Sequence, residues 1–368
     1  MANKQNPKIK KEPFDLAVFL NRISVNDKIF FLDHLRTMVH AGLSLVESLQ
    51  VLSNESENPK MKKIIGEIKE DTEKGKQFSE VLEKYPKIFP SIYVKMIASG
   101  EMSGKLEESL EQIVNQMKKN NELVSSIRGA MVYPAVIVFA ITVVAILMVT
   151  VVLPKLMSLF SEMNIVLPWT TRLLIGVTDF MSQPLNLILI LIFLTVFIFS
   201  FLQLLKRSPK FKILIHKINL HLPIFGGVIK QINLARFSLT LSSLLRSTLP
   251  IVEAVEITAE TCSNKIYQNI LKEAAEKIKK GVNLSSVLEE NKNLFPPMVT
   301  EMIMVGEKTG EIERLLGELS LFYSSEVDKT MKNFSTIIEP AIILVLGLAV
   351  AIVASAIIMP MYSMINSF

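Results

Sequence analysis

Three long stretches of the sequence contain no Asp, Glu, Lys or Arg, and they constrain the fold more than any other feature. They cover residues 129–154, 180–205 and 340–368. Each exceeds the roughly 20 residues that a helix needs to cross a bilayer core. Backbone N–H and C=O groups cannot stay unpaired there, so each stretch is expected to be helical. A buried helix of a soluble protein seldom runs this far without a charge. The sequence therefore predicts three transmembrane helices, at 129–154, 180–205 and 339–360.

The basic residues predict the orientation of these helices. Of the 40 Lys and Arg residues, 20 precede residue 129, two lie in 155–179, 18 lie in 206–338 and none follows. Lys and Arg gather on the cytoplasmic side of membrane helices. The N-terminus and both large polar regions are therefore expected in the cytoplasm, and the C-terminus outside. The net charge of +5 needs no nucleic-acid partner. Anionic lipid headgroups are the expected contact of the basic patch Lys206, Arg207, Lys210 and Lys212.

These expectations give an order of segments along the chain. A short polar N-terminal segment (1–26) precedes the first cytoplasmic helical-bundle domain (27–128) and the first membrane helix. An external loop (155–179) leads to the second membrane helix. A linker and second cytoplasmic bundle (206–338) precede the third membrane helix and an external tail (361–368).

The two cytoplasmic regions resemble each other at a constant offset of 206 positions, and the repeat extends into the membrane helix that follows each region. Segment 180–205 is then an unpaired connector. Two crossings separate the copies, which predicts parallel repeats. The matching pairs are Glu47 and Glu253, Gly75 and Gly281, Phe89-Pro90 and Phe295-Pro296, Gly100-Glu101 and Gly306-Glu307, Gly104 and Gly310, Pro134 and Pro340, and Pro154 and Pro360.

The pattern inside each copy is helical, with no strand-like alternation. Ser24 with Asp27, and Ser44 with Glu47, are spaced as capping boxes at two helix starts, and Gly42 is expected to end the first helix. Further helices are expected near 61–73, 78–83, 90–99 and 106–127. The fold class is therefore all-α: a polytopic membrane protein with two repeated bundles of about six helices each.

The most distinctive motif is Gly-Glu-x-Ser/Thr-Gly, present once in each copy. Its glycines and hydroxyls suit a turn, with Ser103 or Thr309 capping the long helix that follows. For the glutamates, plain solvation weighs equally with a contact to the partner copy, another subunit or a cation. The candidate interface and turn residues are Gly100, Glu101, Gly104, Gly306, Glu307 and Gly310.

Prolines mark the predicted ends of the membrane helices. Tyr133-Pro134 and Glu339-Pro340 are expected at helix starts, where proline's missing N–H is not needed and Glu339 suits the positive end of the helix dipole. Alternatively, Glu339 faces a cationic group of a substrate. Helix ends or kinks are expected at Pro154 and Pro360.

The sequence offers no reaction chemistry. The single cysteine, Cys262, excludes a disulfide framework, and the four histidines lack metal-ligand spacing. Nucleotide-binding glycine motifs are absent from the sequence. We therefore predict no enzyme activity and no cofactor.

The motifs together resemble the type II secretion F-protein family, the inner-membrane platform proteins of type II secretion and type IV pilus machines. One departure is Thr248, where the family usually has glycine, as Gly42 is in the first copy. Besides the doubled Gly-Glu motif, the resemblance rests on Leu167-Pro168-Trp169-Thr170-Thr171-Arg172, Leu222-Pro223-Ile224-Phe225-Gly226, Leu234-Ala235-Arg236-Phe237, Glu339-Pro340 and Ile358-Met359-Pro360-Met361-Tyr362.

This resemblance implies a non-enzymatic hub in the bacterial inner membrane. Its implied partners are a cytoplasmic assembly ATPase, pilins or pseudopilins, other inner-membrane assembly proteins and lipid, and a homo-oligomer is expected. Movement of the cytoplasmic bundles would pass through rigid helices into the membrane and lift pilins into a filament. Pilus assembly and secretion remain equally open.

Two other functions are compatible with parts of the sequence. A small-solute transporter built from parallel repeats is the main alternative, although transport usually places polar or charged groups within the spans. A membrane receptor is less consistent, because the loop 155–179 is small for a ligand domain.

Overall fold

The computed structural model describes residues 23–152, 154, 176, 180, 183–222 and 225–365. All regular secondary structure in these residues is helical, which confirms the all-α class. The predicted segment 1–26 and the loop 155–179 with its Leu167–Arg172 motif lie largely outside the described residues, whereas residues 361–365 of the predicted tail are described and are helical. The chain divides into two compact units: unit 1 comprises Met1–Glu122, Asn233–Ser263 and Tyr267–Leu321, and unit 2 comprises Leu123–Ile232, Asn264–Ile266 and Phe322–Phe368.

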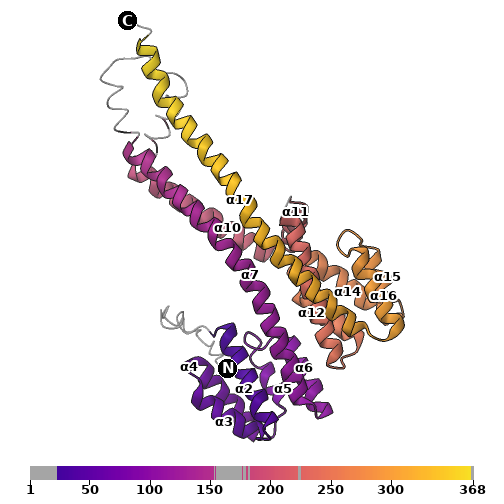
Figure 1. The fold of residues 1–368 in the computed structure, drawn as a ribbon. Coiled ribbons are helices and arrows are strands. Elements are labelled where there is room, and N and C mark those ends of the chain that lie inside the picture. The colour runs from indigo at the N-terminus through magenta and orange to yellow at the C-terminus, as the bar shows by residue number, and fades with distance from the viewer. Residues whose placement is uncertain are drawn as a thin grey trace, which may run out of the picture. The chain divides into compact units, whose positions relative to one another are not determined.

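Unit 1 contains two helical lobes, each formed by one copy of the repeat (Figure 1). We call residues 25–122 lobe 1 and the unit 1 residues from 233 to 321 lobe 2. In lobe 1 the helices are α2 (Val25–His40), α3 (Leu45–Glu55), α4 (Pro59–Glu73), α5 (Phe78–Glu83), α6 (Ser91–Ser103) and the start of α7 (Leu106–Leu147). In lobe 2 they are α12 (Phe225–Arg246) from Asn233 onward, α13 (Ile251–Thr261), α14 (Lys265–Lys279) from Tyr267 onward, α15 (Leu284–Glu289), α16 (Pro297–Thr309) and the start of α17 (Ile312–Ile365).

The helix boundaries reproduce the sequence repeat without a gap. Helices α13, α14, α15, α16 and α17 each begin 206 positions after α3, α4, α5, α6 and α7, respectively. In both lobes the short helix contacts the one after it, α5 on α6 and α15 on α16 (Figure 1). The structure thus confirms two equivalent bundles of about six helices.

Local capping explains where the first helices begin. The hydroxyl of Ser44 accepts a hydrogen bond from the Glu47 amide at 3.2 Å, and the Glu47 carboxylate accepts one from the Ser44 amide at 3.0 Å. Ser24 and Asp27 make the same reciprocal pair at α2. Both predicted capping boxes are therefore confirmed. Gly42, with a φ of 87°, ends α2 as expected.

The same aromatic pair occupies the core of each lobe. The rings of Phe31 and Phe89 lie 5.8 Å apart in lobe 1, and those of Phe237 and Phe295 lie 5.5 Å apart in lobe 2. All four side chains are buried. Burial of one such ring contributes about 1.5–3 kcal/mol, so each lobe has its own hydrophobic core.

Two long helices contribute to both units. α7 has 42 residues and α17 has 54, and each begins in unit 1 and continues in unit 2. Within unit 2 they are joined by a hydrogen bond from Ser126 to Asp328 at 2.5 Å. A π-helical turn, Met148–Val152, follows α7. Unit 2 also contains α10 (Pro184–Arg207) and α11 (Pro209–His221).

Candidate functional site

The first Gly-Glu motif ends α6, and its glutamate caps a different helix. The Glu101 carboxylate accepts hydrogen bonds from the backbone amides of Phe78 at 2.7 Å and Ser79 at 2.9 Å. These amides open α5, whose own N-cap residue, Gln77, makes no side-chain capping bond. Glu101 therefore supplies the missing cap from 22–23 residues away, where a carboxylate also suits the positive helix end.

The second motif repeats this arrangement. Glu307 accepts from the amides of Leu284 at 2.6 Å and Ser285 at 3.3 Å, and also from the Ser285 hydroxyl. Asn283, the N-cap residue of α15, makes no side-chain capping bond. The duplicated glutamate thus holds α5 to α6 and α15 to α16.

The two glycines of each motif serve different purposes. A Cβ on Gly100 would lie 2.3 Å from the Ser109 hydroxyl oxygen, and one on Gly306 would lie 2.7 Å from the Ile312 Cα. The first glycine therefore permits close contact with the following long helix. The second glycine ends the preceding helix in the left-handed region, with φ of 70° at Gly104 and 76° at Gly310.

The predicted capping role of the hydroxyls is wrong. Ser103 donates to the Ser99 carbonyl at 2.7 Å, and Thr309 donates to the Val305 carbonyl at 3.0 Å. Each hydroxyl belongs to the last residue of its helix, directly before the left-handed glycine, and bonds to a carbonyl of that same helix.

A contact of Glu101 or Glu307 with another subunit or a cation stays a prediction. In the described part of the chain, no cluster of three or more His, Cys, Asp or Glu side chains could hold a metal.

The predicted helix starts at Tyr133-Pro134 and Glu339-Pro340 are also wrong. Pro134 lies inside α7, and Pro340 lies inside α17. In each case the helix begins in unit 1 and runs on without a new start, although proline removes one backbone hydrogen bond. The substrate-facing role of Glu339 stays a prediction.

The other two prolines have different outcomes. Pro360 is not a helix end, since α17 continues to Ile365. Pro154 follows the π-helical turn Met148–Val152, in which wider winding replaces the α-helical hydrogen bonds just before the proline.

A polar seam joins the lobes within unit 1, and the sequence did not single it out. Lys95 Nζ lies 2.6 Å from Glu253 Oε1, and the Ser99 hydroxyl donates to the Ser247 carbonyl at 2.8 Å. The Ser247 hydroxyl in turn donates to the Gln112 side chain. We call these five residues the seam. Its two residues on α6, Lys95 and Ser99, are four positions apart and therefore lie on one face of the helix. A single sequence does not identify the surface that this face contacts.

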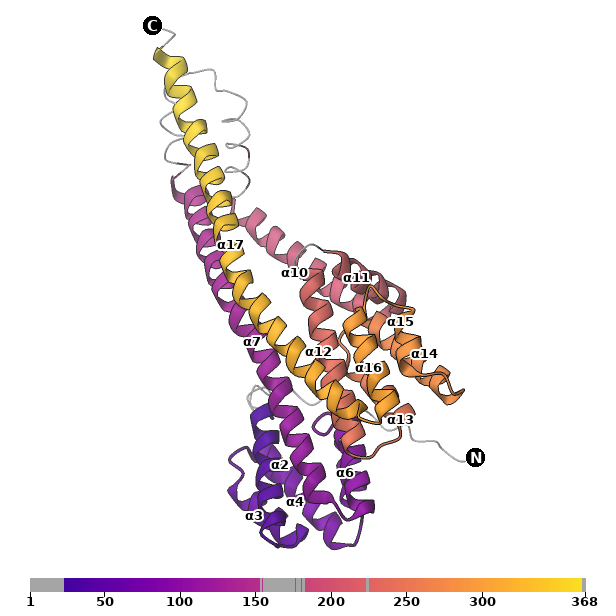
Figure 2. The same ribbon diagram turned by 45° about the vertical axis from the view of Figure 1, so that its right-hand side comes forward.

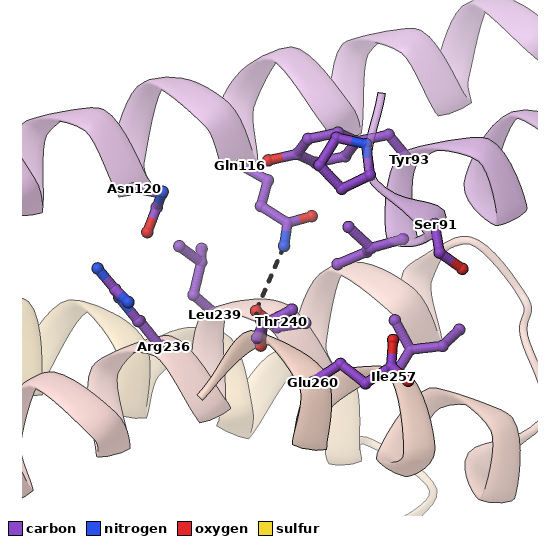
Figure 3. Close-up of a pocket in the computed structure, with 12 residues that line it drawn as sticks. Ser91, Tyr93, Gln116, Asn120, Arg236, Leu239, Thr240, Ile257 and Glu260 are labelled. Carbon is purple, nitrogen blue, oxygen red and sulfur yellow. Dashed lines mark hydrogen bonds between the residues drawn. The ribbon is translucent and has the colours of Figure 1, made fainter. Parts of the chain in front are cut away.

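A cavity of about 340 Å³ is lined by residues of both lobes (Figure 3). Gln116 reaches across it and donates to Thr240 at 3.4 Å, while its carbonyl oxygen is buried without a hydrogen-bond partner among the described residues. Arg236 and Tyr93 also line it. Burial lowers the pKa of Arg236 and raises that of Tyr93 to about 12. The lining of the cavity includes one basic side chain, Arg236, and one acidic side chain, Glu260.

One helix among the described residues is long and apolar enough to cross a membrane. It is α7, and the side chains of its apolar window are almost entirely exposed. The predicted spans at 180–205 and 339–360, and the number of crossings, stay predictions.

Comparison with known proteins gives two matches to one family model, described as Type II secretion system (T2SS), protein F. They cover residues 31–154 and 237–360, and both ends of the second match lie 206 positions after those of the first. The chain belongs to the type II secretion system protein F family. This membership confirms both the recognised resemblance and the internal repeat.

Relatives in this family match almost the full length of the chain. The type IV pilus assembly protein PilC of Thermus thermophilus is 35% identical over 93% of this chain and 84% of that protein. PilC of Pseudomonas aeruginosa is 30% identical over 98% of this chain and 96% of that protein. The type II secretion system protein F of Aeromonas hydrophila is 28% identical over 99% and 93%, respectively.

Proposed function

We propose that this F-family protein is the inner-membrane platform of a type IV pilus or type II secretion machine. The main support is that both copies of the repeat match the family model and that pilus and secretion relatives match nearly the whole chain. The identities to the pilus relatives, 24–35%, bracket those to the secretion relatives, 28–29%. The proposal therefore names the role common to both machines.

The proposed topology follows from the charge pattern. Three spans would place the N-terminus and both lobes in the cytoplasm and the C-terminus outside, because 38 of the 40 basic residues lie in the two polar regions. The lobes would then meet a cytoplasmic assembly ATPase, and the apolar helices would meet pilins or pseudopilins and other inner-membrane assembly proteins. The chain would act as a homo-oligomer, without a cofactor and without enzyme activity.

The proposed mechanism is mechanical coupling. Two features of α7 support it: the helix begins in lobe 1, and its continuous backbone enters the apolar segment without a linker. Helix α17 likewise begins in lobe 2, and its backbone continues without a linker into the apolar segment that follows Glu339. A continuous helix transmits displacement, whereas a flexible connection absorbs it.

The test changes Ala130, Met131 and Val132 of α7 to glycine, which with Gly129 gives four consecutive glycines, in a strain that lacks this chain otherwise. The matched control instead changes Gly129, Met131 and Val132 to alanine, which with Ala130 gives four consecutive alanines; alanine favours helix by about 1 kcal/mol per residue over glycine. We expect the glycine variant to reach the membrane at normal levels but to abolish filament assembly or secretion, and the alanine variant to support it. Normal assembly with four glycines would reject coupling through α7.

A further inference from the structure

Helix α11 begins directly where α10 ends. Ser208 is the only residue between them; its hydroxyl accepts from the Phe211 amide at 3.3 Å, and Pro209 occupies the first turn of α11. The rings of Phe201 and Phe211 meet edge to face at 5.8 Å. The start of α11 is therefore held against the last turns of α10, as Figure 2 shows.

One face of α11 is held within unit 2. His216 Nδ1 accepts a hydrogen bond from the Lys265 amide at 2.8 Å, and the Asn264 side chain donates to the His216 carbonyl at 3.2 Å. Leu220, on the same side, is buried. These contacts fix which side of α11 faces the protein.

The opposite face combines exposed apolar and basic side chains. Ile213, Leu214 and Ile218 are 37%, 51% and 47% exposed, and α11 contains no Asp or Glu. We call this the outer face of α11; at helical spacing it consists of Lys210, Leu214, Lys217, Ile218 and His221, and Ile213 lies at its edge, seven residues before the buried Leu220.

We propose that the outer face of α11 lies in the headgroup region of an anionic bilayer, with its apolar side chains at the boundary of the acyl chains. This rests on the proposed function only in that α10 must cross the membrane. Mixed apolar and cationic side chains, without acids, are typical of helices that lie in the bilayer interface. Lysine stems can lie along the apolar surface while their ammonium groups reach the phosphates.

Continuity with α10 favours lipid over a protein partner. Residues 184–205 contain no charge, and exposed apolar side chains such as Phe193 and Phe197 line α10. The outer face thus begins within a few residues of the predicted membrane boundary. Each lysine near an anionic surface is expected to favour α11 bound to the bilayer over α11 away from the bilayer by about fivefold.

The experiment places an environment-sensitive fluorophore on single cysteines of the full chain, in nanodiscs of phosphatidylglycerol and phosphatidylethanolamine. The native Cys262, which is 2% exposed, is first changed to alanine. Labels go on Leu214→Cys and Ile218→Cys in the outer face, and on Phe199→Cys within α10 as the control for membrane crossing. Lys62→Cys, exposed on lobe 1, is the matched control for water.

We expect brominated lipids to quench the labels at 214, 218 and 199 and not at 62, with blue-shifted emission at 214 and 218. In neutral phosphatidylcholine discs, quenching at 214 and 218 should fall while that at 199 persists; equal quenching in both discs would overturn the anionic preference. Quenching at 199 without quenching at 214 and 218 would overturn the α11 proposal and leave the α10 span intact. Loss of quenching at all three positions would overturn both. Loss of lipid quenching at 214 and 218 only when a cytoplasmic protein is added would assign the outer face to a protein partner instead.

Discussion

Thr248 has the left-handed backbone conformation, with a φ of 59°, that Gly42 has 206 positions earlier with a φ of 87°. The hydrogen bonds around the two residues also match. The amides of Thr248 and Leu249 donate to Leu245 and Leu244, 206 positions after the bonds that Gly42 and Leu43 make to Val39 and Met38. The departure from glycine therefore leaves the turn geometry unchanged, at the cost of a β-branched residue in a region that such residues rarely occupy.

Thr248→Gly should stabilise lobe 2. Left-handed geometry costs a non-glycine residue about 1–3 kcal/mol, and the greater freedom of glycine in the unfolded chain offsets part of the gain, which leaves about 0.5–1 kcal/mol. The single cysteine, Cys262, is buried in lobe 2, so its alkylation reports opening of this lobe in the full chain. We expect alkylation in mild urea to slow about two- to fivefold.

The matched control for this change is Thr248→Ala, which keeps a Cβ and should slow alkylation much less. The reverse change, Gly42→Thr, should destabilise lobe 1 by about 1–3 kcal/mol. Faster alkylation in Thr248→Gly would show that the threonine side chain stabilises lobe 2 by more than its left-handed backbone destabilises it.

Removal of the carboxylate at Glu101 should loosen the start of α5. Loss of a helix cap costs about 0.5–2 kcal/mol, so hydrogen exchange at the amides of Phe78 and Ser79 should accelerate about 2- to 30-fold in Glu101→Ala. Glu307→Ala should do the same at Leu284 and Ser285. The control is Glu108→Ala, an exposed carboxylate on α7 whose ion pair is with Lys105. Unchanged exchange at α5 with impaired self-association would assign Glu101 to an intersubunit contact instead.

The seam should respond to charge reversal in a pairwise way. Lys95 and Glu253 are about 40% exposed, and such pairs contribute about 0.2–1 kcal/mol. Lys95→Glu alone should accelerate hydrogen exchange in segment 247–253 by up to about fivefold, and adding Glu253→Lys should restore it. Equal exchange in the single and double variants would mean that the pair does not hold the lobes together.

The repeat itself explains why this ion pair occurs once. The positions equivalent to Lys95 and Glu253 in the other copy are Glu301 and Glu47. The equivalent contact, between α16 and α3, would place two carboxylates against each other. The duplicated lobes are therefore not interchangeable at the seam.

Local chemistry made much of this fold predictable. Capping boxes such as Ser44 with Glu47 depend on neighbouring residues. The constant offset predicts the position of each helix in one copy from its counterpart in the other. The role of Glu101 was missed because its partners lie 22–23 residues away across a tertiary contact. The helix start predicted at Pro134 is wrong because α7 begins at Leu106 and continues through the proline. The seam depends on surfaces that only the assembled lobes bring together.

Acidification should weaken the attachment of α11 to the start of α14. His216 Nδ1 must be unprotonated to accept the hydrogen bond from the Lys265 amide. Burial, and then the charges of Lys212 and Lys265, lower the pKa of His216 below its usual 6.5. The folded state then binds fewer protons than the unfolded state, so this stabilisation is complete above pH 6.5. It decreases as the pH falls through 6.5 and levels off below the folded pKa. Hydrogen exchange at the Lys265 amide, corrected for its intrinsic pH dependence, should rise over that window. His216→Gln, which does not titrate, should remove the pH dependence; an identical pH profile in this variant would assign it to another group.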